Sequence, residues 1–163
     1  MKKLLSVILA TLIFGTLLTG CGSKGDNSSK EVTLNEGTTL ESMVQKIGDT
    51  NEITMPTKAD DTVAKDLFHL NLDDVEEYSI EYAMVMNSSD NIAMVKAKDG
   101  KVDSVKTALE TRLNDVKKSF EQYLPDQKEK ANKGKVIVKG NYVALLIVEK
   151  VDDAEKTFNE SFK

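Results

Sequence analysis

Residues 135–148 read KVIVKGNYVALLIV, two apolar runs that meet at Gly140-Asn141. This pair is a good two-residue turn signal, so the stretch predicts an antiparallel β-hairpin. In residues 142–148 every side chain is apolar. A strand with one solvent-exposed face alternates polar and apolar residues, and this one does not. We therefore expect the second strand of the hairpin at the centre of a sheet, covered on both faces.

A second hairpin is predicted upstream. Residues 78–86 and 92–98 have the pattern of strands, and the polar sequence NSSDN between them is typical of a turn. In the first strand, Ile80, Tyr82 and Met84 share one face. A helix is expected after each hairpin, over residues 102–124 and from Asp152 onward, because apolar residues recur there at helical spacing. Pro125 breaks or kinks the first of these helices.

The order strand-strand-helix therefore occurs twice. It predicts an α+β fold with an antiparallel sheet of about four strands in ββαββα order and helices packed on one face. The two units are similar in pattern. Either one unit was duplicated, or two hairpin-helix units simply need similar patterning.

Two short helices should precede this core. Thr38 and Glu41 have the spacing of a capping box, and Asp60 or Asp61 can cap a second helix. Residues 53–56 are expected to be an extended connector. If the two helices leave the second face of the sheet open, the row of Ile80, Tyr82 and Met84 is an exposed docking surface.

The N-terminus has the layout of an export signal. Two lysines precede an apolar run at residues 4–18, which is short for a membrane-spanning helix. The run ends in Leu18-Thr19-Gly20-Cys21, which resembles the lipobox of bacterial lipoproteins. The resemblance implies that the Cys21 thiol takes a diacylglyceryl group and that the chain is cut before it. The alternative is an uncleaved anchor with an incidental cysteine, and both place the domain outside the cytoplasm.

This pattern predicts three parts of the chain. Residues 1–20 are a signal peptide that is removed, residues 21–36 are the lipidated N-terminus and a flexible tether, and residues 37–163 are a single α+β domain. The expected location is the extracytoplasmic face of the bacterial cell membrane, with the membrane as a partner through the lipid anchor.

Three further segments carry a family resemblance: IAMVKAKDGK at residues 92–101, YLPDQ at 123–127 and VIVKGNYVALLIV at 136–148. They resemble an uncharacterised bacterial lipoprotein family, domain of unknown function 4358. The resemblance covers residues 53–162 and implies a surface lipoprotein. It implies no activity, ligand or catalytic residue.

Composition argues against several classes of function. The formal net charge is −5 and Arg112 is the single arginine, so nucleic acid is not expected as a partner. Cys21 and His69 are the single cysteine and histidine, and Cys21 is expected to be acylated. Cysteine-histidine catalysis therefore lacks a free thiol, and zinc sites of the usual types lack enough ligands. We expect no catalytic residue, metal or cofactor, and His69 in a loop or at a helix end.

The acidic pairs and the methionines allow two interpretations each. Pairs such as Asp60-Asp61, Asp73-Asp74 and Asp152-Asp153 stand where helices begin, which favours capping over calcium binding or catalysis. Three methionines, Met84, Met86 and Met94, are expected to fill core or half-core positions, with an adaptable binding surface as the alternative.

Two hypotheses for the function follow. The preferred one is a non-catalytic binding or interaction module that contacts an envelope protein or peptide through its sheet face or edge. The alternative is a cell-envelope enzyme or a solute-binding accessory protein, which needs a concave pocket with convergent polar groups. The sequence leaves the oligomeric state open.

Overall fold

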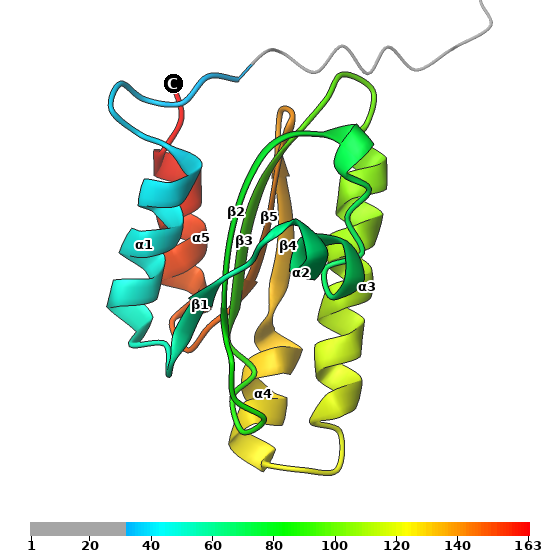
Figure 1. Ribbon diagram of the computed structural model, residues 1–163. Helices are drawn as coiled ribbons and strands as arrows, with labels where there is room; N and C mark the ends of the chain where they lie inside the picture. The colour runs from blue at the N-terminus through cyan, green and yellow to red at the C-terminus, as the bar shows by residue number, and fades with distance from the viewer. Residues whose placement is uncertain (1–31) are drawn as a thin grey trace, which may run out of the picture.

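The computed structural model describes residues 32–163, and it is built on a five-stranded antiparallel sheet (Figure 1). The strands lie in the order β1-β2-β3-β5-β4, with bounds β1 (Pro56–Lys58), β2 (Val75–Ala83), β3 (Asn91–Ala97), β4 (Lys135–Lys139) and β5 (Tyr142–Ile147). The helices are α1 (Leu40–Asn51), α2 (Asp61–Asp66), a 3₁₀ helix (Leu72–Asp74), α3 (Val102–Ser119), α4 (Pro125–Lys133) and α5 (Val151–Glu160). Within the described residues, no helix has both the length and the hydropathy that a membrane span requires.

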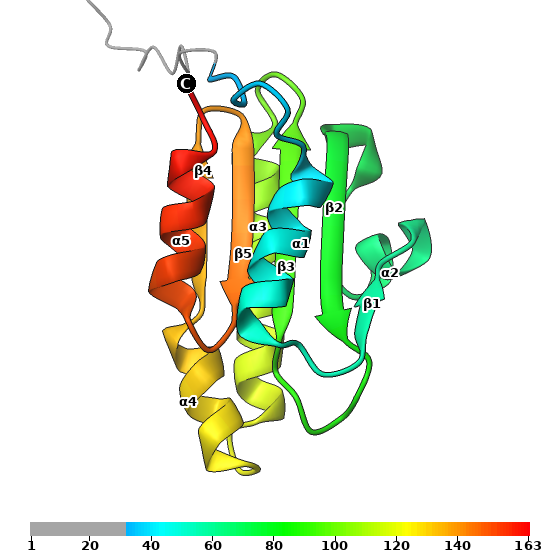
Figure 2. The ribbon, with the colours of Figure 1, turned by 90° about the vertical axis from the view of Figure 1, so that its left-hand side faces the viewer.

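Helices cover both faces of the sheet (Figures 1 and 2). One core lies between the sheet and α2, α3 and α4, and a second core lies between the sheet and α1 and α5. Successive residues of β3 and β5 point into the two cores in turn. Ala93, Val95 and Leu145 pack on the α3 side, whereas Met94 and Leu146 pack on the α1 side. All residues of β5 are buried.

The central position of β5 is thereby confirmed, but the expected arrangement around it is wrong in detail. The helices do not share one face, because α3 and α5 lie on opposite sides of the sheet. The physical reason is that β3 and β5 are apolar on both sides, so one layer of helices would leave a row of apolar side chains in water. The sheet has five strands, not four, because β1 forms where the expected connector ends, and it pairs Pro56 with Ala83 of β2. The additional strand β1 and the additional helix α4, which precedes β4, extend the expected ββαββα order.

Helix ends also differ from the expected ones by a few residues. The N-cap of α1 is Thr39, whose side chain accepts a hydrogen bond from the backbone of Ser42, while the Ser42 hydroxyl accepts one from Thr39. Asp60 caps α2 as predicted. The long helix α3 ends at Ser119, and α4 begins at Pro125 in its N1 position, where a missing N–H costs nothing.

The two described ends of the chain lie together. Leu34 forms a β-bridge with Phe162, and the backbone nitrogen of Asn35 donates to the oxygen of Ser161 at 2.9 Å. Residues 32–36, which the sequence assigns to the tether, are therefore packed against the domain. In Figure 1 both ends lie at the top of the sheet, whereas the turn between β2 and β3 lies at the opposite end.

Candidate ligand-binding groove

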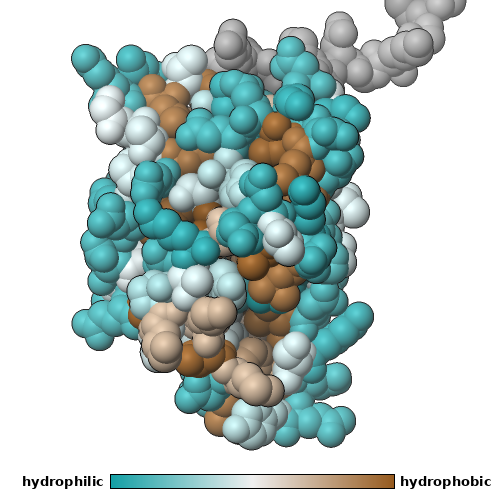
Figure 3. Space-filling model, viewed as in Figure 1, coloured by the Kyte–Doolittle hydropathy of each residue, from teal (hydrophilic) through white to brown (hydrophobic). Residues whose placement is uncertain are grey.

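A groove of about 650 Å³ lies at the end of the sheet that is remote from the two chain ends. Its walls are the end of β2, the turn after it, and the last turns of α3 with the segment that follows. Exposed apolar side chains stand at its rim: Met84 is 64% exposed, Met86 95% and Tyr123 60%. Figure 3 shows apolar side chains gathered over the lower half of this face. The groove is thus an apolar surface open to solvent.

Arg112 of α3 lies in the groove wall. Its Nε and Nη2 donate to Oδ1 of Asn91 at 3.0 and 2.9 Å, and its Cζ lies 5.1 Å from the ring centroid of Phe68, a cation-π contact. Asn91 is buried and lines the same groove, which places the guanidinium end of Arg112 there. Burial lowers the pKa of Arg112 to about 10, against the opposing charge of Asp115. The guanidinium is therefore protonated at neutral pH.

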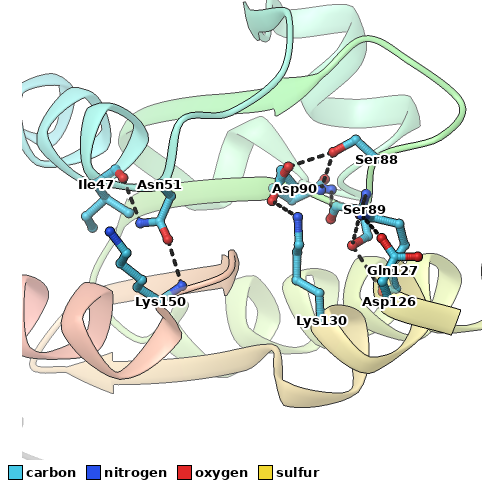
Figure 4. A network of polar contacts seen from close by, with 10 residues as sticks. Ile47, Asn51, Ser88, Ser89, Asp90, Asp126, Gln127, Lys130 and Lys150 are labelled. Atoms are coloured by element: carbon cyan, nitrogen blue, oxygen red, sulfur yellow. Dashed lines mark hydrogen bonds and ion pairs between the residues drawn. The ribbon is translucent and has the colours of Figure 1, made fainter. Parts of the chain in front are cut away.

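Asn91 is held in turn by the turn after β2. Its Nδ2 donates to the backbone oxygen of Ser89 at 3.0 Å. Ser89 is fixed to α4, because its backbone nitrogen donates to Oε1 of Gln127 at 3.0 Å and its hydroxyl to the Gln127 backbone oxygen at 3.1 Å (Figure 4). A chain of hydrogen bonds therefore runs from Gln127 through Ser89 and Asn91 to Arg112.

A buried ion pair fixes the same turn. Lys130 Nζ lies 2.8 Å from Oδ1 of Asp90, and only 11% and 6% of the two side chains are exposed. The hydroxyl of Ser88 donates to Oδ2 of Asp90 at 2.6 Å (Figure 4). Both oxygens of the buried carboxylate are thus satisfied, and α4 holds the rim of the groove at two points.

The row of Ile80, Tyr82 and Met84 is not one exposed face. Ile80 and Tyr82 are 2% and 9% exposed, because α2 and α3 cover that side of the sheet. The ring of Tyr82 packs edge-on against Phe68, with centroids 6.2 Å apart. Met84 follows the last residue of β2 and is exposed. The expected exposed row therefore does not form, and of its three residues only Met84 is exposed.

The three methionines also divide into buried and exposed residues. Met94 is fully buried in the α1 core, as expected, but Met84 and Met86 are not core residues. The strand ends before them, so the alternation that placed them inside no longer applies. The predicted lipidation residue Cys21 and the lipobox residues before it lie outside the described residues.

The expected acidic and histidine residues have structural partners. Asp74 accepts hydrogen bonds from Lys101 Nζ at 2.8 Å and Ser104 Oγ at 2.7 Å, and the Lys101 bond lowers the pKa of Asp74. His69 follows α2 with φ +58° and lies with Nε2 2.7 Å from Oδ2 of Asp115. Across residues 32–163, no three His, Cys, Asp or Glu side chains are arranged to hold a metal ion.

A smaller pocket of about 330 Å³ lies between α1 and the β1-β2 edge. It is acidic, with Asp49 and Glu81 near each other, and Lys58 is its one lining cation. Burial, together with the charge of Asp49, raises the pKa of Glu81. The two pockets thus differ in the sign of their charge.

The model of a protein family, Domain of unknown function (DUF4358), matches residues 49–148. The chain belongs to this family. No curated protein and no solved structure matches the chain. The DUF4358 region spans all five strands, α3 and α4, and it includes every residue that lines the groove. Most of α1 and the whole of α5 lie outside it.

The YLPDQ segment of the DUF4358 region gains a structural meaning. Tyr123 stands at the groove rim, Pro125 begins α4, and Gln127 holds Ser89. The sequence identified this segment only as part of a resemblance. The sequence also held a signal for Arg112. This residue stands three residues after Leu109 and four before Val116, on the apolar stripe of α3 that faces the core, where a charged residue is unusual.

Proposed function

We propose that the chain is a lipoprotein, anchored through Cys21 at the extracytoplasmic face of the bacterial cell membrane, whose domain is a non-catalytic binding module. Its ligand occupies the Arg112 groove. The observation that carries the proposal is the composition of the groove. The guanidinium of Arg112 lies among exposed apolar side chains. Exposed apolar patches on soluble domains mark contact sites.

Helices cover both faces of the sheet, so a partner has no open sheet face to dock on. The sheet edges β1 and β4 stay open, but the exposed large apolar side chains gather at the groove, with Met84, Met86 and Tyr123 at its rim. Methionine side chains are flexible and polarizable, which suits a surface that adapts to a ligand. This supports a binding role at the end of the sheet.

The described start of the chain and the groove lie at opposite ends of the domain. The described chain starts beside its C-terminus, where Leu34 pairs with Phe162, and the groove lies at the other end of the strands (Figure 1). In a chain attached to a bilayer through Cys21, the groove is on the side of the domain away from the point where the tether joins it. A ligand in the envelope space can enter it without crossing the lipid surface.

A solute-binding role is the second candidate, and the concavity of the site favours it. A volume of about 650 Å³ lies within the range of small-molecule sites, about 300–1,000 Å³. An envelope enzyme is less well supported, since the lining holds no Asp, Glu, His or Cys to act as a general base or nucleophile.

Two variants test the anchor and the groove separately. In cells, the wild-type chain should fractionate with membranes and Cys21→Ser should not. A photo-crosslinking amino acid at Met86 should give covalent adducts, detected by intact-protein mass spectrometry. The same amino acid at Lys156, exposed on α5, is the matched control and should give none. Membrane retention of Cys21→Ser, or equal adducts at both positions, would contradict the proposal.

A further inference from the structure

The charge of the groove is carried by one residue. Among the lining residues Arg112 is the only charged side chain, and the others are apolar or neutral polar. The chain as a whole is acidic, with a formal net charge of −5. A ligand that complements this lining has one negative charge and an otherwise apolar body, since a second charge would be left without a partner in an apolar wall.

The guanidinium has donors to spare. It carries five N–H donors, and Asn91 Oδ1 takes one from Nε and one from Nη2. No hydrogen bond to Nη1 is formed within residues 32–163. In that range, one side-chain nitrogen or oxygen is fully buried without a hydrogen-bond partner, and it is Oδ1 of Asn141. Nη1 also lacks a partner but is not fully buried, so it keeps some contact with solvent. Arg112 is half-buried and lines the groove, so the outer edge of its guanidinium has donors that no described residue takes up.

The position of that edge is fixed in advance. Ser89 and Gln127 hold Asn91, and Asn91 holds the inner edge of Arg112. The ring of Phe68 makes a cation-π contact with the same guanidinium. A planar guanidinium with its outer Nη pair free matches a planar carboxylate, which accepts two parallel hydrogen bonds.

We propose, on the basis of the binding role above, that the groove takes a small apolar monocarboxylate. Its carboxylate lies on the free edge of Arg112 and its aliphatic body lies against Met84, Met86 and Tyr123. The single positive charge favours a monoanion over a phosphate dianion. The volume of about 650 Å³, which is that of a small-molecule site, favours a short aliphatic chain over a folded partner.

Calorimetry on the mature chain from residue 21 onward, carrying Cys21→Ser and free of detergent, tests this. Octanoate is the probe and should bind with one site per chain. Acetate, which lacks the body, and octanamide, which lacks the charge, should bind at least tenfold more weakly. Arg112→Gln should lose at least tenfold in octanoate affinity.

Because Arg112 also supports Asn91, a second variant keeps the test independent of folding. Met86 is almost fully exposed, so Met86→Glu leaves the core intact, yet it brings a negative charge to the rim and should weaken octanoate binding at least tenfold. Val138→Glu, at a half-exposed position on β4 away from the groove, is the matched control and should bind octanoate as the parent does.

Several outcomes overturn the inference. Equal binding of octanoate and octanamide removes the role of the carboxylate, and tighter binding of octyl phosphate replaces it with a phosphate. Binding of a short apolar peptide with a free C-terminus, without octanoate binding, makes the partner a protein. Adducts at Met86 in cells without octanoate binding refute the ligand class alone, whereas the absence of both refutes the binding role as well.

Discussion

The ion pair between Lys130 and Asp90 determines how firmly the groove rim is held. Lys130→Ala removes the cation and leaves the carboxylate of Asp90 with 6% of its side chain exposed. Breaking a buried pair by removing one partner costs about 3–5 kcal/mol, because the remaining charge stays desolvated. Since Ser88 still donates to Asp90 at 2.6 Å, we expect the low end, about 3 kcal/mol of unfolding free energy.

Two further variants isolate the effect of burial. Lys133 on the same helix pairs with Glu129 at 2.7 Å, but 60% and 68% of these side chains are exposed. Lys133→Ala removes a comparable ion pair and should change stability little. The double substitution Lys130→Met with Asp90→Asn should be less destabilised than Lys130→Ala, because it leaves no buried charge without a partner.

The assay is urea denaturation of the mature Cys21→Ser chain at pH 7, followed by circular dichroism, with linear extrapolation to zero urea. The reasoning is refuted if Lys130→Ala loses no more than Lys133→Ala, or if the double variant is less stable than the single one.

Three further substitutions test other parts of the structure. Glu81→Gln should raise the unfolding free energy at pH 7, because burial raises the pKa of this carboxyl and the charged form is disfavoured in the fold. The gain in unfolding free energy should vanish below about pH 4, where Glu81 is protonated in both the folded and the unfolded state. An equal gain at both pH values would argue against this explanation. Thr39→Ala should cost about 1 kcal/mol in urea denaturation by removing the cap of α1, whereas Thr38→Ala should cost little, and the reverse order would restore the capping box expected from sequence. Gly134→Ala should cost about 1–3 kcal/mol, since its Cβ would lie 2.8 Å from a methyl of Leu113; an unchanged melting temperature would show that the neighbouring side chains yield.

The sequence predicted the strands of the sheet better than it predicted which helices cover each of the two faces. A strand that is apolar at every position, such as β5, reports that both of its faces are buried, and that was confirmed. It does not report which helix covers which face, so α5 was placed beside α3. The short strand β1 gave no signal because three residues that include Pro56 are too few to show a strand period.

The groove was beyond reach for a different reason. Its residues come from the C-cap of α2 (Leu67), from β2 and the turn after it, and from β3, α3 and the segment before α4. Only the packing of these elements brings them together. Met86 seemed internal because the alternation was extended past Ala83, where β2 ends. Two signals in the sequence pointed to the site: the position of Arg112 on an apolar stripe, and the alternative interpretation of Met84 and Met86 as an adaptable binding surface.

The most direct test of the binding role is an NMR titration of the mature Cys21→Ser chain with octanoate. If octanoate occupies the groove, the Nε–H resonance of Arg112 should shift together with the backbone amides of residues 84–88 and 116–123, and octanamide should leave these resonances in place. Unchanged Arg112 and turn resonances at saturating octanoate, or shifts confined to the acidic pocket around Glu81, would contradict it.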